Sequence, residues 1–327
     1  MAEGRWEESI RTDLAHEANE LAMQRQGQQI PGVQTQAEQK GPTQVTRVLI
    51  QTPEAGAALN KQPGYYVTIE SQAFRGRDKD ELESAAQVVA EEVRGFIRGL
   101  NLNDEASALV VGLGNWNATP DALGPRVVEK VLVTRHLFYS SPPEKRGGLR
   151  PVCAISPGVL GITGLETGEI VAALVQKIRP QFLLVVDALA SRSTDRVGAA
   201  VQLADTGIQP GSGIGNKRQG ITPHTLGIPV IAMGVPTVVE ATTIISDALE
   251  QMEKEKSPDA SGAWQPPAQS VRKAVMNRVL HPFLRDLIVT PKEIDVLIHD
   301  LSRALAGAIN IALHPGVTPE EVFRYLD

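Results

Sequence analysis

The chain has 327 residues, of which 42% are hydrophobic and 21% charged, and its formal net charge is −6. This composition supports a folded core and excludes disorder of the whole chain, and the lack of a Lys/Arg block disfavours direct nucleic-acid binding. The single cysteine, Cys153, excludes an intrachain disulfide framework and a cysteine-built zinc site. No signal peptide follows Met1 and no uncharged apolar run reaches membrane-spanning length, so an intracellular protein without membrane contact is expected.

The first 45 residues are polar and rich in Gln, Glu and Ala, and they predict an appendage to the main domain. Within them the pattern predicts a helix over Glu17–Gln26 and an exposed loop over Gly27–Gln44. Strands are then predicted at Thr46–Gln51 and Tyr65–Glu70, and apolar residues at helical spacing predict a helix over Lys79–Gly99.

Strands and helices alternate through the middle of the chain. Strands are predicted at Ala108–Gly112, Val152–Ser156, Gln181–Asp187, Val197–Ala204 and Pro229–Gly234. Helices are predicted at Gly124–His136, from a capping box at Thr163 and Glu166 to Ile178, and after caps at Thr237 and Glu240. This alternation predicts an α/β fold with a central, mostly parallel sheet covered by helices on both faces.

A helical segment is expected at the C-terminal end of the domain. Prolines and a glycine predict a variable loop near residues 253–269, followed by a helix over Ser270–Asp286. Thr290-Pro291-Lys292-Glu293 then has the N-cap, N1 and N3 residues of a last long helix that reaches Leu313.

Gly112-Leu113-Gly114-Asn115 directly follows a predicted strand. A dinucleotide-binding fingerprint requires a third glycine where Asn117 stands, so the motif is also interpreted as a tight turn that needs glycine backbone freedom. No Gly-x-Ser-x-Gly or His-Glu-x-x-His motif occurs, and Cys153 in an apolar strand is interpreted as a core residue.

Two aspartates lie at the carboxyl ends of predicted strands. Asp121 follows the first of these strands and would by itself suit a helix N-cap. Asp187 ends a buried strand, where another helix cap or a salt bridge to Arg192 is the structural alternative to a role in a ligand crevice. If their strands are neighbours, the carboxylates face one another, and their pKa values separate so that one holds a proton while the other activates water. That arrangement suits general acid–base hydrolysis.

A glycine-rich stretch, Asp205–Arg218, follows the next predicted strand. Its order does not match a P-loop, because Asn216 separates Gly215 from Lys217. Lys217 and Arg218 suit recognition of an acidic substrate side chain, and equally suit a solvated basic loop.

These segments together resemble the germination protease family nearly from end to end. The resemblance is carried by Ser9-Ile10-Arg11-Thr12-Asp13-Leu14-Ala15, Gly112-Leu113-Gly114-Asn115, Thr119 to Pro125, Pro157-Gly158-Val159, Val186-Asp187-Ala188-Leu189-Ala190, Gly211 to Arg218 and Val289-Thr290-Pro291-Lys292-Glu293. Several of these stretches are long and unusual, which makes chance similarity improbable.

The resemblance implies an atypical aspartic endopeptidase, made as a zymogen in the forespore, that degrades small acid-soluble spore proteins at germination. It also implies a homotetramer, no cofactor or metal, and a fold similar to hydrogenase maturation proteases. The family's two essential aspartates map onto Asp121 and Asp187, and Asn115, Lys217 and Arg218 are the expected substrate-binding residues.

The N-terminal segment looks like a cleavage site of this family, which cuts after an acidic residue and before a bulky apolar one. Thr12-Asp13-Leu14-Ala15-His16-Glu17 has that pattern, so autocleavage is expected between Asp13 and Leu14. This division gives a propeptide over residues 1–13 and a single α/β peptidase domain over residues 14–327. Alternatively, Thr12 or Asp13 caps the helix that follows.

Two other functions remain open from the sequence. Hydrogenase maturation proteases have a similar glycine turn and two carboxylates that bind nickel with a histidine, whereas this chain has Gln209, and no histidine, in the Asp205–Arg218 loop. A non-catalytic binding module on the same sheet is the second alternative, which the pair Asp121 and Asp187 disfavours.

Overall fold

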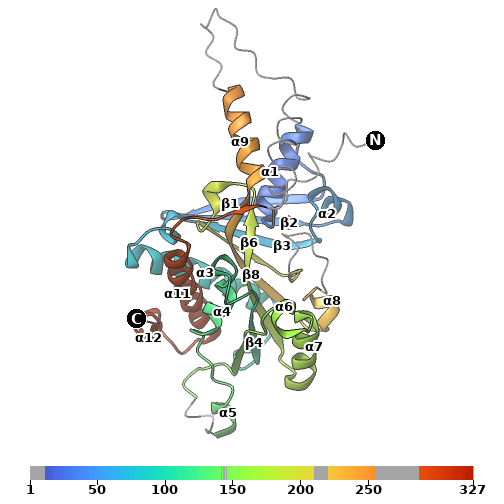
Figure 1. The fold of residues 1–327 in the computed structure, drawn as a ribbon. Coiled ribbons are helices and arrows are strands. Elements are labelled where there is room, and N and C mark those ends of the chain that lie inside the picture. The colour runs from blue at the N-terminus through green and yellow to red at the C-terminus, as the bar shows by residue number, and fades with distance from the viewer. Residues whose placement is uncertain are drawn as a thin grey trace, which may run out of the picture.

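The computed structural model describes residues 12–140, 142, 144, 146–209, 220–254 and 287–326, except for the side chains of residues 26, 246 and 249–254. Within these ranges the strands form one nine-stranded sheet with the order β1-β2-β3-β7-β8-β6-β4-β5, and β9 pairs with β8 (Figure 1). The strands are β1 (Val33–Lys40), β2 (Thr43–Ile50), β3 (Gly64–Glu70), β4 (Ala108–Gly112), β5 (Val152–Ile155), β6 (Phe182–Ser191), β7 (Ala200–Ala204), β8 (Val230–Glu240) and β9 (Ile288–Val289).

The sheet has a parallel half and an antiparallel half. β8, β6, β4 and β5 run parallel to one another, whereas β1, β2, β3, β7 and β8 pair antiparallel. The α/β class with a central sheet flanked by helices is therefore confirmed. The expectation of mostly parallel strands is correct for the half that carries Asp187 and wrong for the other half. There β1 and β2 are joined by a two-residue turn, which only an antiparallel pair allows, and β3 pairs antiparallel with β2 and β7.

Helices cover both faces of the sheet, as expected (Figure 1). One face packs against α3 (Lys79–Gly99), α4 (Leu123–Val128), α11 (Ile294–Leu313) and α12 (Pro319–Leu326). The other face packs against α1 (Ala15–Gln26) and α2 (Pro53–Leu59) over the antiparallel half, and against α7 (Thr167–Ile178) over the parallel half. The remaining helices are α5 (Leu137–Ser140), α6 (Leu160–Thr163), α8 (Pro223–Leu226) and α9 (Ala241–Lys254).

The predicted N-terminal appendage is part of the sheet. Most of the segment expected to be an exposed loop, Gly27–Gln44, forms β1 and the start of β2, joined by a turn at Gly41 with φ of 58°. Almost every side chain of β1 is exposed, because it is an edge strand that backbone pairing with β2 holds in place. Such a strand has no apolar alternation, so its sequence gives no strand signal.

Several predicted element boundaries are also wrong. α4 ends at Val128 and does not reach His136, because Thr134 N and Arg135 N both donate to Val152 O and join this segment to β5. Thr163 lies in α6, whose end has Gly164 in the left-handed region, and α7 begins only at Thr167.

The caps predicted at Thr237 and at Thr290 are wrong. Thr237 lies inside β8, and Thr290 Oγ1 donates a hydrogen bond to Thr237 O instead of capping α11, which begins at Ile294. The expected loop at Ser257–Gln269 and helix at Ser270–Asp286 lie outside the described residues.

Of the described helices, α11 is long and apolar enough to cross a membrane by length and composition, yet 78% of that stretch is buried inside the protein. It packs against α3 and α4 in the larger core cluster. Its apolar character is therefore explained by its place in the core of the domain.

Candidate functional site

The two candidate aspartates belong to neighbouring strands: Asp121 follows β4, and Asp187 lies within β6, which continues to Ser191 and does not end at Asp187 as predicted. β4 and β6 pair in parallel, with Gly112 opposite Val186, so Asp187 is the next residue of β6 beyond the last pair. Leu113 N donates to Val186 O over 2.8 Å and keeps the loop after β4 beside β6. The strand adjacency on which the predicted aspartate pair depends is therefore present.

The turn after β4 fixes Asp121. Asn115 N donates to both Asp121 O (3.0 Å) and Asp121 Oδ2 (2.9 Å). Gly114 has φ of 122°, and a Cβ there would lie 1.9 Å from Asp121 O, so this close approach requires glycine. The interpretation of the Gly-Leu-Gly-Asn motif as a tight turn is confirmed. The N-cap interpretation of Asp121 is wrong, because α4 has no side-chain cap and this carboxylate accepts from the turn.

Asp187 is buried, with 9% of its surface exposed, and its Oδ1 accepts from the N–H of Ala188 over 2.9 Å. Burial raises the pKa of Asp187 well above its ordinary value, and the carboxylates of Asp121 and Asp13 raise it further. The alternative of a salt bridge to Arg192 is wrong, because Arg192 Nη2 pairs with Asp247 Oδ1 at 2.5 Å. A protonated carboxyl beside a second carboxylate is the arrangement that general acid–base hydrolysis needs.

The predicted cleavage segment docks on the same strand. Asp13 N donates to Ala190 O over 3.0 Å, and Asp13 Oδ2 accepts from Ala190 N over 2.8 Å, three residues beyond Asp187 on β6. Leu14 is fully buried in a small cluster with Leu189 and Ala200. The Asp13–Leu14 peptide therefore lies against the end of β6, three residues beyond Asp187 and near enough for the Asp13 carboxylate to raise the pKa of Asp187. The alternative of a side-chain cap is wrong, since Leu14 is the N-cap residue of α1.

Lys61 and Gln202 bind the main chain of this segment. Lys61 Nζ donates to Thr12 O and to Asp13 O, each over 2.9 Å. Gln202 Nε2 also donates to Asp13 O over 2.9 Å, and its Oε1 accepts from Ala15 N over 2.6 Å. Neither residue could be selected from the sequence, because a lone lysine in a loop and a lone glutamine in a strand belong to no motif.

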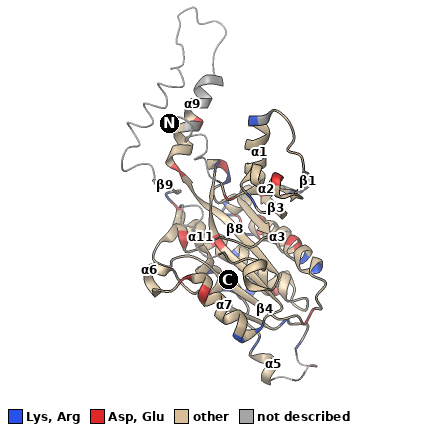
Figure 2. Cartoon of the chain, turned by 90° about the vertical axis from the view of Figure 1, so that its right-hand side faces the viewer, with Lys and Arg blue, Asp and Glu red and all other residues tan. Residues whose placement is uncertain are grey.

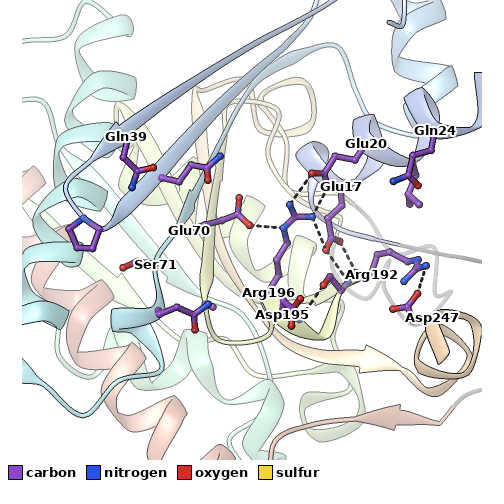
Figure 3. A pocket seen from close by; sticks show the side chains of 16 residues that line it. Glu17, Glu20, Gln24, Gln39, Glu70, Ser71, Arg192, Asp195, Arg196 and Asp247 are labelled. Carbon is purple, nitrogen blue, oxygen red and sulfur yellow. Dashed lines mark hydrogen bonds and ion pairs between the residues drawn. The ribbon is translucent and has the colours of Figure 1, made fainter. Parts of the chain in front are cut away.

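Charged side chains that line a pocket next to this segment bind the start of α1 (Figure 3). Arg196 pairs with Glu17, Glu20 and Glu70, as the dashed lines in Figure 3 mark. The buried carboxylate of Glu17 also accepts from the N–H groups of Arg192 and Ser193, just after β6. These contacts hold α1, and therefore the residues before it, against the end of β6.

The predicted substrate-binding residues are only partly described. Asn115 lies in the turn after β4, where its Oδ1 accepts from Asn117 N, and it positions Asp121 through its backbone. Lys217 and Arg218 lie outside the described residues. Ile208, which precedes that segment, exchanges two backbone hydrogen bonds with Ile221, which follows it, and Ile208 also packs against the Leu14 cluster.

The expected absence of a bound metal and of direct nucleic-acid binding can be compared with the arrangement of charged residues. Among the residues that the structure describes, no three His, Cys, Asp or Glu side chains are arranged to hold a metal ion. In the view of Figure 2, acidic and basic residues are interspersed over the helices and loops. The roles expected for Asp121, Asp187, Asn115, Asp13 and Leu14 remain predictions.

Sequence comparison gives the family. The model of the germination protease family matches residues 10–261 and 267–326. A germination protease of Clostridium tetani is 42% identical over 325 residues, covering 98% of this chain and 100% of the relative. One of Caldanaerobacter subterraneus is 44% identical over 323 residues, with 97% and 98% covered, and one of Priestia megaterium is 40% identical over 359 residues, with 97% of each covered.

Among solved structures, a nickel–iron hydrogenase maturation protease, HycI, from Thermococcus kodakarensis is similar with a TM-score of 0.26 and 14% identity, over 61% of this chain and 92% of that one. The family match spans the β4 turn, both aspartates and the segment that docks on β6. The chain therefore belongs to the germination protease family and is a peptidase.

Proposed function

We propose that this peptidase is an aspartic-type endopeptidase in which Asp121 and Asp187 activate water, and that it first cuts its own chain between Asp13 and Leu14. The observation that carries the proposal is the docking of that peptide on β6, the strand that also holds Asp187. The buried Asp187 has a raised pKa next to Asp121, so the pair suits one protonated and one ionised carboxyl.

The reaction needs only water and these groups. The ionised carboxylate takes a proton from water as the water oxygen attacks the carbonyl carbon of Asp13, and the electron pair of the C=O bond moves to its oxygen. When the C–N bond breaks, the electron pair on the oxygen re-forms the C=O bond, and the protonated carboxyl gives its proton to the nitrogen of Leu14. The two aspartates end with their protonation states exchanged. The products are a carboxylic acid at Asp13 and an amino group at Leu14, which become a carboxylate and an ammonium group by proton transfer.

The side chains on both sides of this bond suit the specificity proposed for substrates, namely an acidic residue before the cut and a large apolar residue after it. The Asp13 carboxylate accepts from a backbone N–H of β6, which favours an anionic acceptor at that position. Leu14 fills an apolar pocket formed with Leu189 and Ala200, which favours a bulky aliphatic residue.

The biological setting follows from the family resemblance. The substrates proposed are small acid-soluble spore proteins, which the enzyme starts to degrade during germination in the spore core. Residues 1–13 are then the propeptide of a zymogen that is made during sporulation, and the active protein is a homotetramer. Light scattering after size-exclusion chromatography tests the last point, and a monomer would refute it.

The test is incubation of purified full-length chain with a small acid-soluble spore protein, followed by mass spectrometry of both chains. Wild type is expected to cut the substrate after Glu and its own chain after Asp13. Asp121→Asn and Asp187→Asn are each expected to slow both cuts by at least about 10²-fold, because each removes one proton-transfer group.

Asp195→Asn, an exposed aspartate in the loop after β6, is the matched control and should cut like wild type. Full activity of both site variants would refute the aspartate pair. Cutting that appears only on addition of nickel would favour the metal-dependent maturation protease, and no cutting under either condition would favour a binding module.

A further inference from the structure

We infer that Lys61 and Gln202 bind the carbonyl oxygen of the residue before the cut bond, and that they do so for peptide substrates as well as for the enzyme's own chain. The inference rests on the proposed function, because it takes Asp13–Leu14 as the bond that is cut. It assigns Lys61 and Gln202 the role of stabilising negative charge on that oxygen, a role that no motif in the sequence indicates.

The carbonyl oxygen of Asp13 accepts two hydrogen bonds from side chains. Lys61 Nζ comes from the segment between α2 and β3, Gln202 Nε2 comes from β7, and each lies 2.9 Å from that oxygen. An oxyanion-binding site has donors about 2.7–3.1 Å from the position that the developing oxyanion will occupy, and both donors already bind the oxygen that would carry this charge. Other carbonyls of helices and strands are bound mainly by backbone N–H groups, so this carbonyl is set apart from them.

The amide of Gln202 binds the backbone on both sides of Leu14. Its Nε2 donates to Asp13 O and its Oε1 accepts from Ala15 N. Leu14 between them is extended, with φ of −81° and ψ of 124°. One donor and one acceptor facing an extended residue reproduce the contacts that a neighbouring strand would make. Gln202 therefore recognises backbone, and this recognition extends to any peptide that lies extended in the same place.

Sheet register puts Gln202 and Asp187 on one face. Both residues pair with Gly234 of β8, Gln202 from the antiparallel side and Asp187 from the parallel side. Residues that pair directly across strands point to the same face, so both side chains flank a position that has no side chain. With adjacent strands about 4.8 Å apart, the Cα atoms of Gln202 and Asp187 are about 10 Å apart. A Cβ at Gly234 would lie 2.5 Å from Leu189 Cγ, so the side chain of Leu189, which belongs to the Leu14 cluster, lies over this glycine.

The two donors lie in partly buried surroundings that contain charged groups, since Gln202 is buried and Lys61 is half-buried. Burial lowers the pKa of Lys61, and the carboxylates of Asp13 and Glu17 oppose that shift. When water attacks the carbon of Asp13, the electron pair that moves to its oxygen lies between an ammonium group and an amide N–H. Such preorganised donors stabilise the tetrahedral intermediate more than the planar substrate.

The test compares two pairs of matched variants of the full-length chain. Lys61→Met and Gln202→Leu remove the donors, and Lys177→Met and Gln176→Leu change the same residue types at exposed positions of α7. Mass spectrometry follows self-cleavage over time. Loss of either donor is expected to slow it by about 10²–10³-fold, the range for one oxyanion donor, and the α7 variants should match wild type.

A second measurement separates carbonyl binding from mere docking of the N-terminal segment. After each full-length variant has cut itself, kcat and KM are measured on a synthetic peptide with the sequence of residues 8–20. The concentration of active enzyme is taken as the concentration of chains that begin at Leu14, so that incomplete self-cleavage does not lower kcat. Carbonyl stabilisation predicts a lower kcat at saturating peptide. A docking role alone raises KM and leaves kcat unchanged, which would overturn the inference.

Conservative variants sharpen the result. Gln202→Glu keeps an acceptor for the N–H of the second residue after the cut and loses the donor, so it should have the low kcat of Gln202→Leu. Lys61→Arg keeps a cationic donor and should recover part of the kcat lost in Lys61→Met. If wild type cuts neither itself nor the peptide, the proposed function fails and this inference with it. If Asp187→Asn is inactive while the donor variants keep wild-type kcat, only this inference fails.

Discussion

The buried carboxyl of Asp187 gives the stability of the protein a pH dependence that one substitution removes. Asp187→Asn keeps the size of the side chain and an oxygen that accepts from Ala188 N–H, and it abolishes the titrating group. Because burial and the neighbouring carboxylates raise its pKa in the folded state, Asp187 binds its proton more tightly when the chain is folded. Its contribution to stability is therefore complete below the ordinary pKa of 3.8 and decreases as pH rises toward the folded pKa.

The size of the effect follows from proton linkage. Each pH unit between the ordinary and the folded pKa costs about 1.4 kcal/mol for one proton, so the cost between pH 4 and pH 7 has a ceiling of about 4 kcal/mol. The Asn side chain of Asp187→Asn does not ionise, so this variant does not lose that free energy and should be more stable than wild type at pH 7. For a chain of this length, 1 kcal/mol corresponds to roughly 1.5 °C in Tm, so the Tm difference has a ceiling of about 6 °C.

The assay is urea unfolding of wild type and variant at half-unit steps from pH 4 to pH 7, with the intact mass of each chain verified. The free-energy difference in favour of Asp187→Asn should grow with pH and then level off. Asp121→Asn should weaken the pH dependence in part, because the Asp121 carboxylate adds to the shift. The exposed Asp195→Asn is the control. A difference that stays constant over this range would refute the reasoning.

Three further predictions concern the surroundings of the site. Leu14→Ala leaves a cavity at a fully buried position and should lower the free energy of unfolding by about 2–5 kcal/mol. Residues 12–15 should then be held less tightly, and the Asp13 amide, which donates to Ala190 O, should exchange its hydrogen faster. Unchanged protection of this amide would contradict the prediction. Gly114→Ala puts a Cβ 1.9 Å from Asp121 O, so it should cut cleavage more than the exposed Gly95→Ala in α3, and equal rates would argue against the turn. Burial would raise the pKa of Glu20, but hydrogen bonds from His16 and Arg196 lower it to about 2, so wild type should lose stability as pH falls from 4.5 toward 2. Arg196→Met should flatten that pH profile in urea titrations, and a profile as steep as wild type would count against the ion-pair cluster.

The fold was predictable where each element carries its own signal. The apolar stripe of α3 and the apolar strands β4 and β6 have patterns that burial enforces, and the structure has α3, β4 and the start of β6 at or close to the predicted bounds. β1 was missed because almost all of its side chains are exposed, so its sequence lacks the alternating apolar residues by which a strand is predicted. The extension of β6 to Ser191 was missed because it depends on the pairing of residues 188–191 with β8, a contact between segments far apart in sequence.

The residues of the candidate site also fall into those that the sequence indicated and those that it did not. Asp121, Asp187, Asp13 and Leu14 were selected from motifs and from their positions relative to predicted strands. The structure brings the segment of Asp13 and Leu14 to Ala190 of β6, three residues beyond Asp187. Lys61 and Gln202 were missed, since what distinguishes them is a carbonyl oxygen that lies 48 and 189 residues away along the chain.

The sequence by itself determined the α/β class, the family, the glycine turn after β4 and the two aspartates, because each depends on neighbours within a few residues or on a motif. Only the tertiary structure decided that the sheet is half antiparallel and that the N-terminal segment lies on β6. It alone put Gln202, Gly234 and Asp187 in one row. The physical reason is that register and strand order are set by burial of whole faces against helices, a free energy that belongs to the assembled sheet and to no single segment.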